Sequence, residues 1–269
     1  MLGIKPQKYI LFIVGLYPLF KLKNKCFIIF NVIKEWVLKL LVTQMSLKTK
    51  YIVAIGGGGF THGTDKSLDN FILGIKDKKN FNIGFLPTAS NDDNAKTQLF
   101  YKRFRNLGHS LSHFDLHTSS HGFNNWMTKK DIVYVGGGNT YNMLKFWKNE
   151  KLFRIFIDAY NNGTILSGVS AGAVCWFNSI LTNSLNNRFQ ETKGLGLIKY
   201  SCTPHASSEP ERIVILEQKV KNALMSPGFA IDDGVAVLFI DGKFSKVFSS
   251  RPRHSAYFIT EAGIKNLEE

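Results

Sequence analysis

Hydrophobic and polar positions follow two distinct patterns from residue 51 to about residue 168. Short, mostly continuous apolar runs indicate strands buried on both faces, whereas apolar positions spaced three or four residues apart indicate helices. The two kinds of segment alternate, which predicts a mostly parallel sheet covered by helices on both faces. The predicted strands are 51–55, 83–86, 111–116, 132–135 and 164–168, and the predicted helices are 67–75, 94–106, 140–151 and 153–160.

The pattern changes after residue 205. A long amphipathic stretch at 209–224 predicts a helix, and apolar runs then alternate with turn residues at 236–240, 243–248 and 256–260. Asp241-Gly242 separates the first two runs, and an Asp-Gly pair between strands is a strong hairpin signal. We therefore expect the C-terminal part to add antiparallel strands to one edge of the sheet. Because neither a linker nor an internal repeat occurs, a single α/β domain is predicted over 46–269.

The first 45 residues are predicted to form an apolar, basic N-terminal extension. Residues 1–44 carry seven lysines and one acidic residue, and their longest apolar run is twelve residues, whereas a helix needs about 20 apolar residues to span a bilayer. Three interpretations stay open. The segment is a dispensable extension upstream of a natural start at Met45, a basic amphipathic segment on a membrane surface, or a secretion signal without a small-residue cleavage motif. Membrane association is expected only through residues 1–44.

Charge and cysteine content narrow the function classes. The 269 residues carry a formal net charge of +14, which suggests an acidic partner. However, +6 of that charge lies in residues 1–44, seven of the 34 basic residues are arginine, and no nucleic-acid-binding motif occurs. We therefore predict no nucleic-acid partner. The three cysteines contain no Cys-x-x-Cys pair and predict neither a disulfide framework nor a zinc site, so a reduced, cytoplasmic protein is expected.

A serine within a glycine-rich turn is the first candidate for chemistry. The segment GVSAG at 168–172 follows a predicted strand and precedes an apolar stretch at 173–177 that is predicted to be helical, which is the setting of a G-x-S-x-G nucleophile elbow. Small neighbours allow the strained backbone that exposes the hydroxyl of Ser170, and the N-terminus of the next helix offers N–H groups to an oxyanion. The alternative is a tight turn with an ordinary capping serine.

Glycines 136–138, followed by Asn139 and Thr140, occupy another predicted strand-to-helix junction. A glycine-rich backbone exposes N–H groups to a ligand. This suggests the second half of an oxyanion hole, with candidate substrate contacts at Asn139 and Thr140, and a tight turn alone is the alternative. Glycines 56–59 form a similar loop. Neither run matches the dinucleotide or P-loop pattern, so nucleotide binding is not favoured.

A serine nucleophile needs a general base. Among the seven histidines, only His205 directly follows a short predicted strand downstream of Ser170. Two positions compete for the acid that would orient this base. Glu191 is the only carboxylate between Ser170 and His205, whereas Asp232 and Asp233 follow a strand-like segment from which a loop could return to the site. For each of these residues, an ordinary solvated side chain is the alternative.

Together these motifs resemble the peptidase E (aspartyl dipeptidase) family of serine peptidases, to which cyanophycinase is more distantly related. The resemblance covers about residues 51–240, and the order and spacing of the motifs are more specific than any single motif. They are AIGGGGF (54–60), FLPTASND (85–92), YVGGGNT (134–140), GVSAGAVCWF (168–177), LGL (195–197), PH with EPER (204–212) and AIDDGVAV (230–237).

The resemblance implies a flavodoxin-like three-layer fold, similar to class I glutamine amidotransferases, in which serine replaces the cysteine nucleophile. It implies Ser170 as the nucleophile and His205 as the base. The oxyanion hole would use the N–H groups of Ala171 and of Gly137 or Gly138. The implied reaction is cleavage of peptides after an N-terminal aspartyl residue, or of a β-aspartyl backbone as in cyanophycinase. No metal and no organic cofactor are implied.

This sequence departs from the family at positions near the triad. The acid of cyanophycinase-like enzymes falls near Asp233, whereas the aspartate assigned in peptidase E corresponds to Asn183. Many relatives also carry Tyr and Asp after the Pro-His pair, where this chain has Ala206 and Ser207. These departures bear on substrate preference and on activity itself. We favour Asp233 as the acid, with Glu191 second.

The favoured function is a serine exopeptidase that hydrolyses short peptides, predicted to be Asp-X dipeptides, as a monomer or homodimer. Arg188 and Arg212 are candidate partners for the aspartyl side chain of the substrate. The alternative is a catalytically impaired relative that binds small acidic peptides or a protein partner. A third hypothesis, an amidotransferase-like enzyme, is disfavoured by Ser170, because glutaminases of this fold use cysteine there.

Overall fold

The computed structural model describes residues 33–36 and 48–268, and the chain divides into two units, 1–48 and 49–269. In the first unit, the described residues form a helical turn whose Ile33 and Trp36 side chains are exposed. The other predictions for residues 1–45 lie outside the described residues. Within the two ranges described, no helix is long and apolar enough to cross a membrane. All candidate site residues lie in the second unit.

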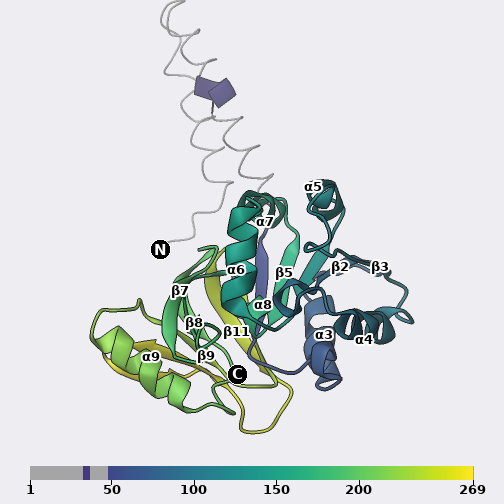
Figure 1. Cartoon of the computed structure of the whole chain (residues 1–269). Helices are drawn as coiled ribbons and strands as arrows, with labels where there is room; N and C mark the ends of the chain where they lie inside the picture. Colours follow the sequence, from purple (N-terminus) through teal and green to yellow (C-terminus); the bar gives the residue numbers. More distant parts are fainter. Residues whose placement is uncertain (1–32, 37–47, 269) are drawn as a thin grey trace, which may run out of the picture. The chain divides into compact units, whose positions relative to one another are not determined.

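A seven-stranded sheet forms the centre of the second unit (Figure 1). Its strands are β1 (Tyr51–Ile55), β2 (Asn82–Leu86), β3 (Ser110–His113), β4 (Ile132–Val135), β5 (Ile165–Val169), β10 (Val235–Ile240) and β11 (Lys243–Ser249). The first five are parallel, in the order β1-β5-β4-β2-β3. Strand β10 pairs antiparallel with β1, and β11 pairs antiparallel with β10. The predicted hairpin therefore extends one edge of the sheet.

Helices cover both faces of this sheet, as the sequence predicts. They are α3 (Lys66–Leu73), α4 (Asn94–Phe104), α5 (Phe123–Met127), α6 (Thr140–Asn149) and α7 (Phe153–Asn161), with short 3-10 turns η2 (Phe60–His62) and η3 (Thr88–Ser90). Alternate residues of β1 point to opposite faces. Ile52 packs in one core with Trp147 of α6, whereas Val53 packs in another with Leu68 of α3 and Phe100 of α4. The result is the expected three-layer α/β arrangement.

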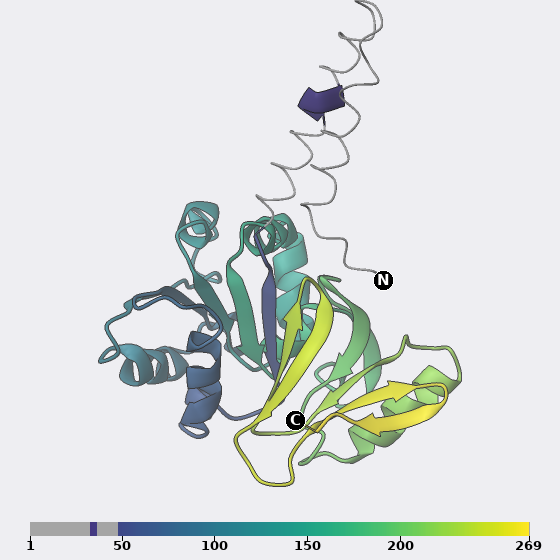
Figure 2. The same cartoon turned by 180° about the vertical axis from the view of Figure 1, so that it is seen from behind.

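A second sheet of six strands was not expected from the sequence. Its strands are β6 (Phe177–Thr182), β7 (Gln190–Lys193), β8 (Ile198–Thr203), β9 (Gly228–Ile231), β12 (Ala256–Thr260) and β13 (Gly263–Asn266), in the order β13-β12-β9-β8-β6-β7. Helix α9 (Glu211–Lys221) packs on one face of it, with Leu216 and Val220 against Ile259 of β12. Figure 2 shows β12 and β13, the last yellow strands, beside α9.

Two details of the sequence prediction need correction. The apolar stretch 173–177 is not one helix, because α8 spans only Ala171–Val174 and β6 begins at Phe177. The C-terminal strands do not all join one edge, because β12 pairs with β9 of the second sheet. Aromatic rings join the two sheets: Phe239 of β10 contacts Phe177 of β6 and Phe229 of β9, with ring centroids 5.4 and 5.1 Å apart.

Candidate active site

Ser170 occupies the sharp turn between β5 and α8. Its backbone has φ 54° and ψ −115°, a strained combination for a residue with a side chain, and its N–H donates to the Ile55 carbonyl at 2.9 Å. The neighbouring glycines are required by close approach. A Cβ atom on Gly172 would lie 2.1 Å from the Val135 carbonyl oxygen, and one on Gly168 would lie 2.3 Å from the Gly172 carbonyl oxygen. This is the geometry of a nucleophile elbow.

Two hydrogen bonds join Ser170, His205 and Asp233 in a row. His205 Nε2 lies 2.8 Å from Ser170 Oγ, and His205 Nδ1 lies 2.7 Å from Asp233 Oδ1. An ionised carboxylate only accepts hydrogen bonds, so Nδ1 carries the proton and Nε2 is free to accept the serine proton. His205 follows β8 with φ 57°, and Asp233 follows β9. Strands of both sheets therefore contribute to this row.

The Asp233 carboxylate is held by the turn that follows His205. Ser207 and Ser208 both donate hydroxyl hydrogen bonds to Asp233 Oδ2, and the Asp233 N–H donates to Ser207 Oγ at 3.0 Å. Burial alone would raise the pKa of the Asp233 carboxyl. The hydrogen bonds from His205 and Ser208 outweigh burial and hold this pKa well below its usual range. The carboxylate is therefore ionised at neutral pH.

The glycine loop after β1 closes the site behind the acid. Gly57 forms an isolated parallel bridge with Asp233, and Gly234 N–H donates to the Gly57 carbonyl at 2.8 Å. A Cβ atom at Gly57 would lie 1.8 Å from Asp233 Oδ1. No definite role was predicted for this loop, glycines 56–59, from the sequence. In the structure, its lack of side chains lets the backbone pack against Asp233 and His205.

The second glycine loop, 136–138, lies next to the serine. A Cβ atom at Gly137 would be 3.2 Å from Ser170 Cβ. Among the described residues, no protein atom accepts a hydrogen bond from the N–H groups of Gly137, Gly138 or Ala171. Backbone donors without a partner beside a serine hydroxyl are what an oxyanion hole requires.

Asn139 and Thr140 begin helix α6. The Asn139 side chain accepts from Asn142 N–H at 2.8 Å and donates to the Ser184 carbonyl at 2.9 Å. Thr140 is buried. The contacts of Asn139 cap the helix and attach it to the loop after β6, so Asn139 has a structural role there.

The model of peptidase family S51 matches residues 52–247, a segment that contains Ser170, His205 and Asp233. The chain belongs to peptidase family S51. This is the peptidase E and cyanophycinase family, and its members are serine peptidases, so the protein is a hydrolase whose substrates are peptides.

Relatives of the S51 protein agree with this assignment. The uncharacterized peptidase YgaJ of Bacillus subtilis (strain 168) is 38% identical over 215 residues, which cover 79% of this chain and 93% of YgaJ. The uncharacterized peptidase Lmo0363 of Listeria monocytogenes is 26% identical over 173 residues, which cover 60% of this chain and 82% of Lmo0363. A peptidase from an acI-B1 Actinobacterium has a similar fold, with a TM-score of 0.61 at 17% identity, covering 82% of this chain and 94% of that one.

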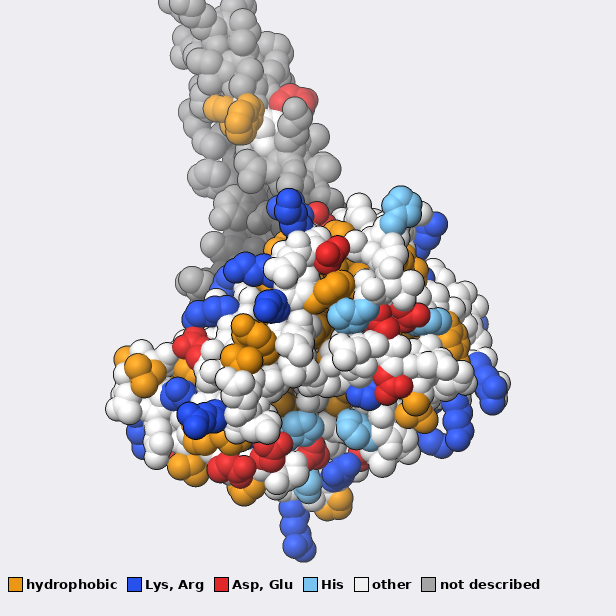
Figure 3. Space-filling model, in the orientation of Figure 1, with side chains coloured by type: hydrophobic (Ala, Val, Ile, Leu, Met, Phe, Trp, Pro, Cys, Tyr) orange, Lys and Arg blue, Asp and Glu red, His pale blue; other side chains and the backbone are white. Residues whose placement is uncertain are grey.

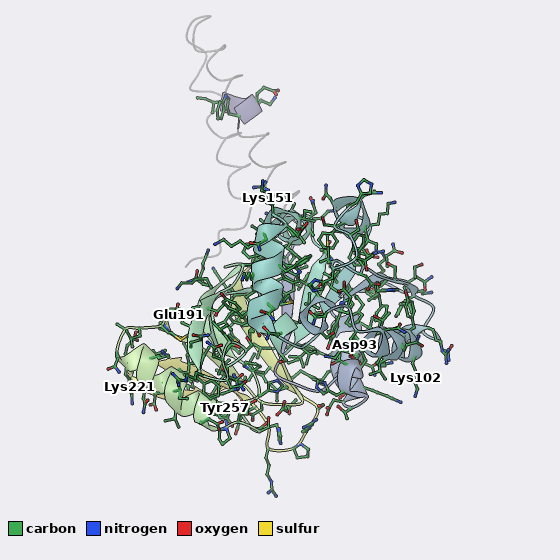
Figure 4. The ribbon with its side chains drawn as sticks, viewed as in Figure 1. Asp93, Lys102, Lys151, Glu191, Lys221 and Tyr257 are labelled. Carbon is green, nitrogen blue, oxygen red and sulfur yellow. The ribbon has the colours of Figure 1, made fainter. Side chains whose placement is uncertain are left out.

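Other carboxylates considered for the triad have different partners. Glu191 lies on β7 (labelled in Figure 4), where it accepts from Ser179 at 2.7 Å and pairs with Lys193. Asp232 is buried, and its Oδ2 accepts from the Ser255 N–H at 3.0 Å. Asp233 therefore bonds to His205, whereas Glu191 bonds to Ser179 and Lys193.

The two arginines proposed to recognise substrate differ in environment. Arg188 is exposed and has no hydrogen bond or ion pair within the described part of the chain. Arg212 is buried, pairs with Glu209 at 3.0 Å, and donates to Asn183 Oδ1 at 3.2 Å. Asn183, at the position of the peptidase E aspartate, therefore bonds to Arg212.

Acidic and histidine side chains gather on one face of the S51 protein. Figure 3 shows them close together between α9 and α3, whereas most lysine and arginine side chains lie nearer the edges.

Ser207 and Ser208, which bond to the Asp233 carboxylate, were not predicted from the sequence as partners of the acid. Their signal was their position, two and three residues after the predicted base.

Proposed function

We propose that Ser170 is the nucleophile, His205 the general base and Asp233 the acid that orients the base. The observation that carries this proposal is the pair of hydrogen bonds, 2.8 and 2.7 Å, that joins the three side chains in order. The same arrangement supports serine hydrolases on unrelated folds. Gly137, Gly138 and Ala171 would supply N–H groups to the developing oxyanion.

In the proposed reaction, His205 transfers protons between Ser170, the leaving amine and water. Ser170 Oγ attacks the scissile carbonyl carbon while Nε2 of His205 takes the serine proton. The carbonyl oxygen becomes an oxyanion and accepts hydrogen bonds from backbone N–H groups. The tetrahedral intermediate then collapses, the C–N bond breaks, and Nε2–H protonates the leaving amine. A water molecule, deprotonated by His205, hydrolyses the acyl-enzyme, and the proton returns to Ser170.

The proposed substrates are short peptides with an N-terminal aspartyl residue, cleaved in the cytoplasm. The resemblance of the motifs to aspartyl dipeptidases supports this choice. Recognition of an aspartyl side chain needs a cation or several hydrogen-bond donors. Arg212 is a candidate because its buried Nε has no partner among the described residues, although its other nitrogens are engaged.

Hydrolysis of an Asp-X dipeptide panel by the full-length protein tests the proposal. Ser170→Ala is expected to abolish hydrolysis, whereas Ser245→Ala, at an exposed serine of β11, should leave kcat unchanged. Hydrolysis that survives Ser170→Ala would refute the nucleophile assignment. Absence of hydrolysis by the wild type across the panel would favour a binding function for small acidic peptides.

A further inference from the structure

A lysine from a distant helix contacts the glycine loop beside Ser170. Lys96, in the first turn of α4, extends to residues 136–138, and its Nζ donates a hydrogen bond to the Gly137 carbonyl oxygen at 2.8 Å. The Lys96 side chain is half-buried, and burial lowers the pKa of its ammonium, an effect that Asp93 partly offsets. Partial burial disfavours an ammonium that has no paired charge, so the contact of Lys96 with this loop calls for a physical reason.

The half-buried ammonium of Lys96 bonds to a neutral group rather than to a carboxylate. No ion pair among the described residues includes it. Its hydrogen-bond partner is a neutral backbone carbonyl. Figure 4 labels Asp93, at the start of α4, nearer the middle of the molecule than Lys102, near the end of the helix. Lys96 thus belongs to the end of α4 that approaches the active-site loops.

The glycine loop itself has few other hydrogen bonds at its centre, although it packs closely against Ala89 and Ser170. Its two ends are fixed, because Gly136 N–H donates to the Leu86 carbonyl at 2.9 Å and Asn139 N–H donates to the Ala89 carbonyl at 2.7 Å. Between these bonds, the peptide between Gly137 and Gly138 has no Cβ on either side to limit its rotation. In the described part of the chain, Lys96 is the only side chain that bonds to the backbone of these three glycines.

Holding one carbonyl oxygen also orients the N–H on the other side of the same peptide. A trans peptide is planar, and its C=O and N–H groups point in opposite directions. The bond from Lys96 to the Gly137 carbonyl therefore fixes the direction of the Gly138 N–H. A positive charge on the carbonyl oxygen also polarises the amide, which makes its N–H a stronger donor.

We propose that Lys96 is a positioning residue for the oxyanion hole: its ammonium holds the peptide between Gly137 and Gly138 so that this loop presents its N–H groups beside Ser170. The inference rests on the proposed function of Ser170 as the nucleophile. Lys96 makes no contact with substrate in this proposal. Lys96 acts through the peptide plane, and its contribution to catalysis appears when negative charge develops on the substrate oxygen.

The test compares Lys96→Met, which removes the ammonium but keeps most of the side-chain volume, with Lys96→Arg, which keeps a charged donor. Lys102→Met is the matched control, because Lys102 is exposed on the same helix. Removal of a direct oxyanion donor lowers kcat by about 10²–10³-fold, so loss of a residue that positions one is expected to lower kcat about 10–100-fold. KM should change less than about twofold, and Lys96→Arg should restore most of the activity.

A peptide aldehyde provides a second measurement, because its hemiacetal oxygen occupies the oxyanion position. The inhibition constant of the aldehyde should rise by the same factor by which kcat/KM falls, whereas the product dipeptide should bind Lys96→Met and wild type alike. Circular dichroism checks folding, and Lys96→Gln serves the same comparison if Lys96→Met does not fold.

Four results would overturn the inference. An unchanged kcat in Lys96→Met would show that the loop holds its geometry without the ammonium. A rise in KM alone would show that Lys96 binds a substrate carboxylate. A loss of activity that Lys96→Arg does not restore and that parallels a loss of folded protein would indicate a structural role alone. A wild-type protein that neither hydrolyses dipeptides nor reacts with a fluorophosphonate would overturn the proposed function, and this role of Lys96 with it.

Discussion

Replacement of Asp233 by asparagine tests the proposed triad most sharply, because the structure determines how the new amide must sit. Ser207 and Ser208 both donate to Oδ2 of Asp233, and an oxygen at this position keeps both bonds, so we expect asparagine to place its oxygen there. The amide nitrogen then faces Nδ1 of His205, where the carboxylate now accepts. Nδ1 becomes an acceptor, and the ring proton moves to Nε2.

In this tautomer, His205 cannot accept the proton of Ser170. The corresponding substitution in a serine protease triad lowers kcat by about 10⁴-fold. We expect a loss of the same order here, equivalent to about 5 kcal/mol in the activation free energy. KM for an Asp-X dipeptide should change little, because the geometry of the site is preserved. Steady-state hydrolysis at neutral pH, measured with an assay sensitive to 10⁵-fold losses, provides the numbers.

Two matched variants control for nonspecific effects. Asp232→Asn changes the adjacent carboxylate, which bonds to Ser255, and Glu191→Gln changes the alternative acid on β7. Both are expected to keep kcat within about threefold of the wild type. An Asp233→Asn variant that kept more than a tenth of the wild-type kcat would refute the assignment of Asp233 as the acid that orients His205. It would equally be refuted if Glu191→Gln produced the larger loss.

Three further predictions concern the serines beside Asp233, the turn that holds Ser170, and a buried carboxylate of α3. Ser207→Ala combined with Ser208→Ala should lower kcat about tenfold with little change in the urea midpoint, because the two hydroxyls hold the Asp233 carboxylate; a wild-type kcat would contradict this. Gly172→Ala should lower the free energy of unfolding by about 3 kcal/mol or more in urea titrations, because its Cβ would overlap a strand carbonyl. Burial raises the pKa of Asp69 to about 6 in the folded protein. A folded pKa above the unfolded value means that stability falls as pH rises from about 4 to 6, by about 3 kcal/mol, and levels off above that. Asp69→Asn should flatten this part of a plot of melting temperature against pH, and an unchanged slope would exclude Asp69 as its source.

The parallel sheet was predictable because its strands are short apolar runs with clear ends. The run at 51–55 coincides with β1, and the run at 132–135 coincides with β4, since glycines follow each of them. The second sheet lacked such signals. Strand β7 is Gln190–Lys193, four polar or charged residues at a sheet edge, and α8 and β6 join in one apolar stretch without a visible boundary. Hydrophobic periodicity therefore could not separate them.

The candidate site was predictable to the extent that its residues lie in local motifs. Ser170 and His205 follow strands within recognisable sequence patterns. The choice between Asp233 and Glu191 depends on pairing between distant segments, such as the bridge between Gly57 and Asp233, which periodicity does not reveal. The roles of the oxyanion and substrate-contact residues stay predictions until variants are measured.

The aromatic contact between the two sheets has a consequence for catalytic alignment. Ser170, the proposed nucleophile, follows β5 of the first sheet, and His205, the proposed base, follows β8 of the second, so each sheet positions one part of the proposed triad. Phe239 of the first sheet packs against both Phe177 and Phe229 of the second. A slide of about 1 Å at this joint would misplace the reacting groups and could cost about 10²-fold in rate. Through their packing, these three rings thus help to keep Ser170 and His205 aligned for the proposed reaction.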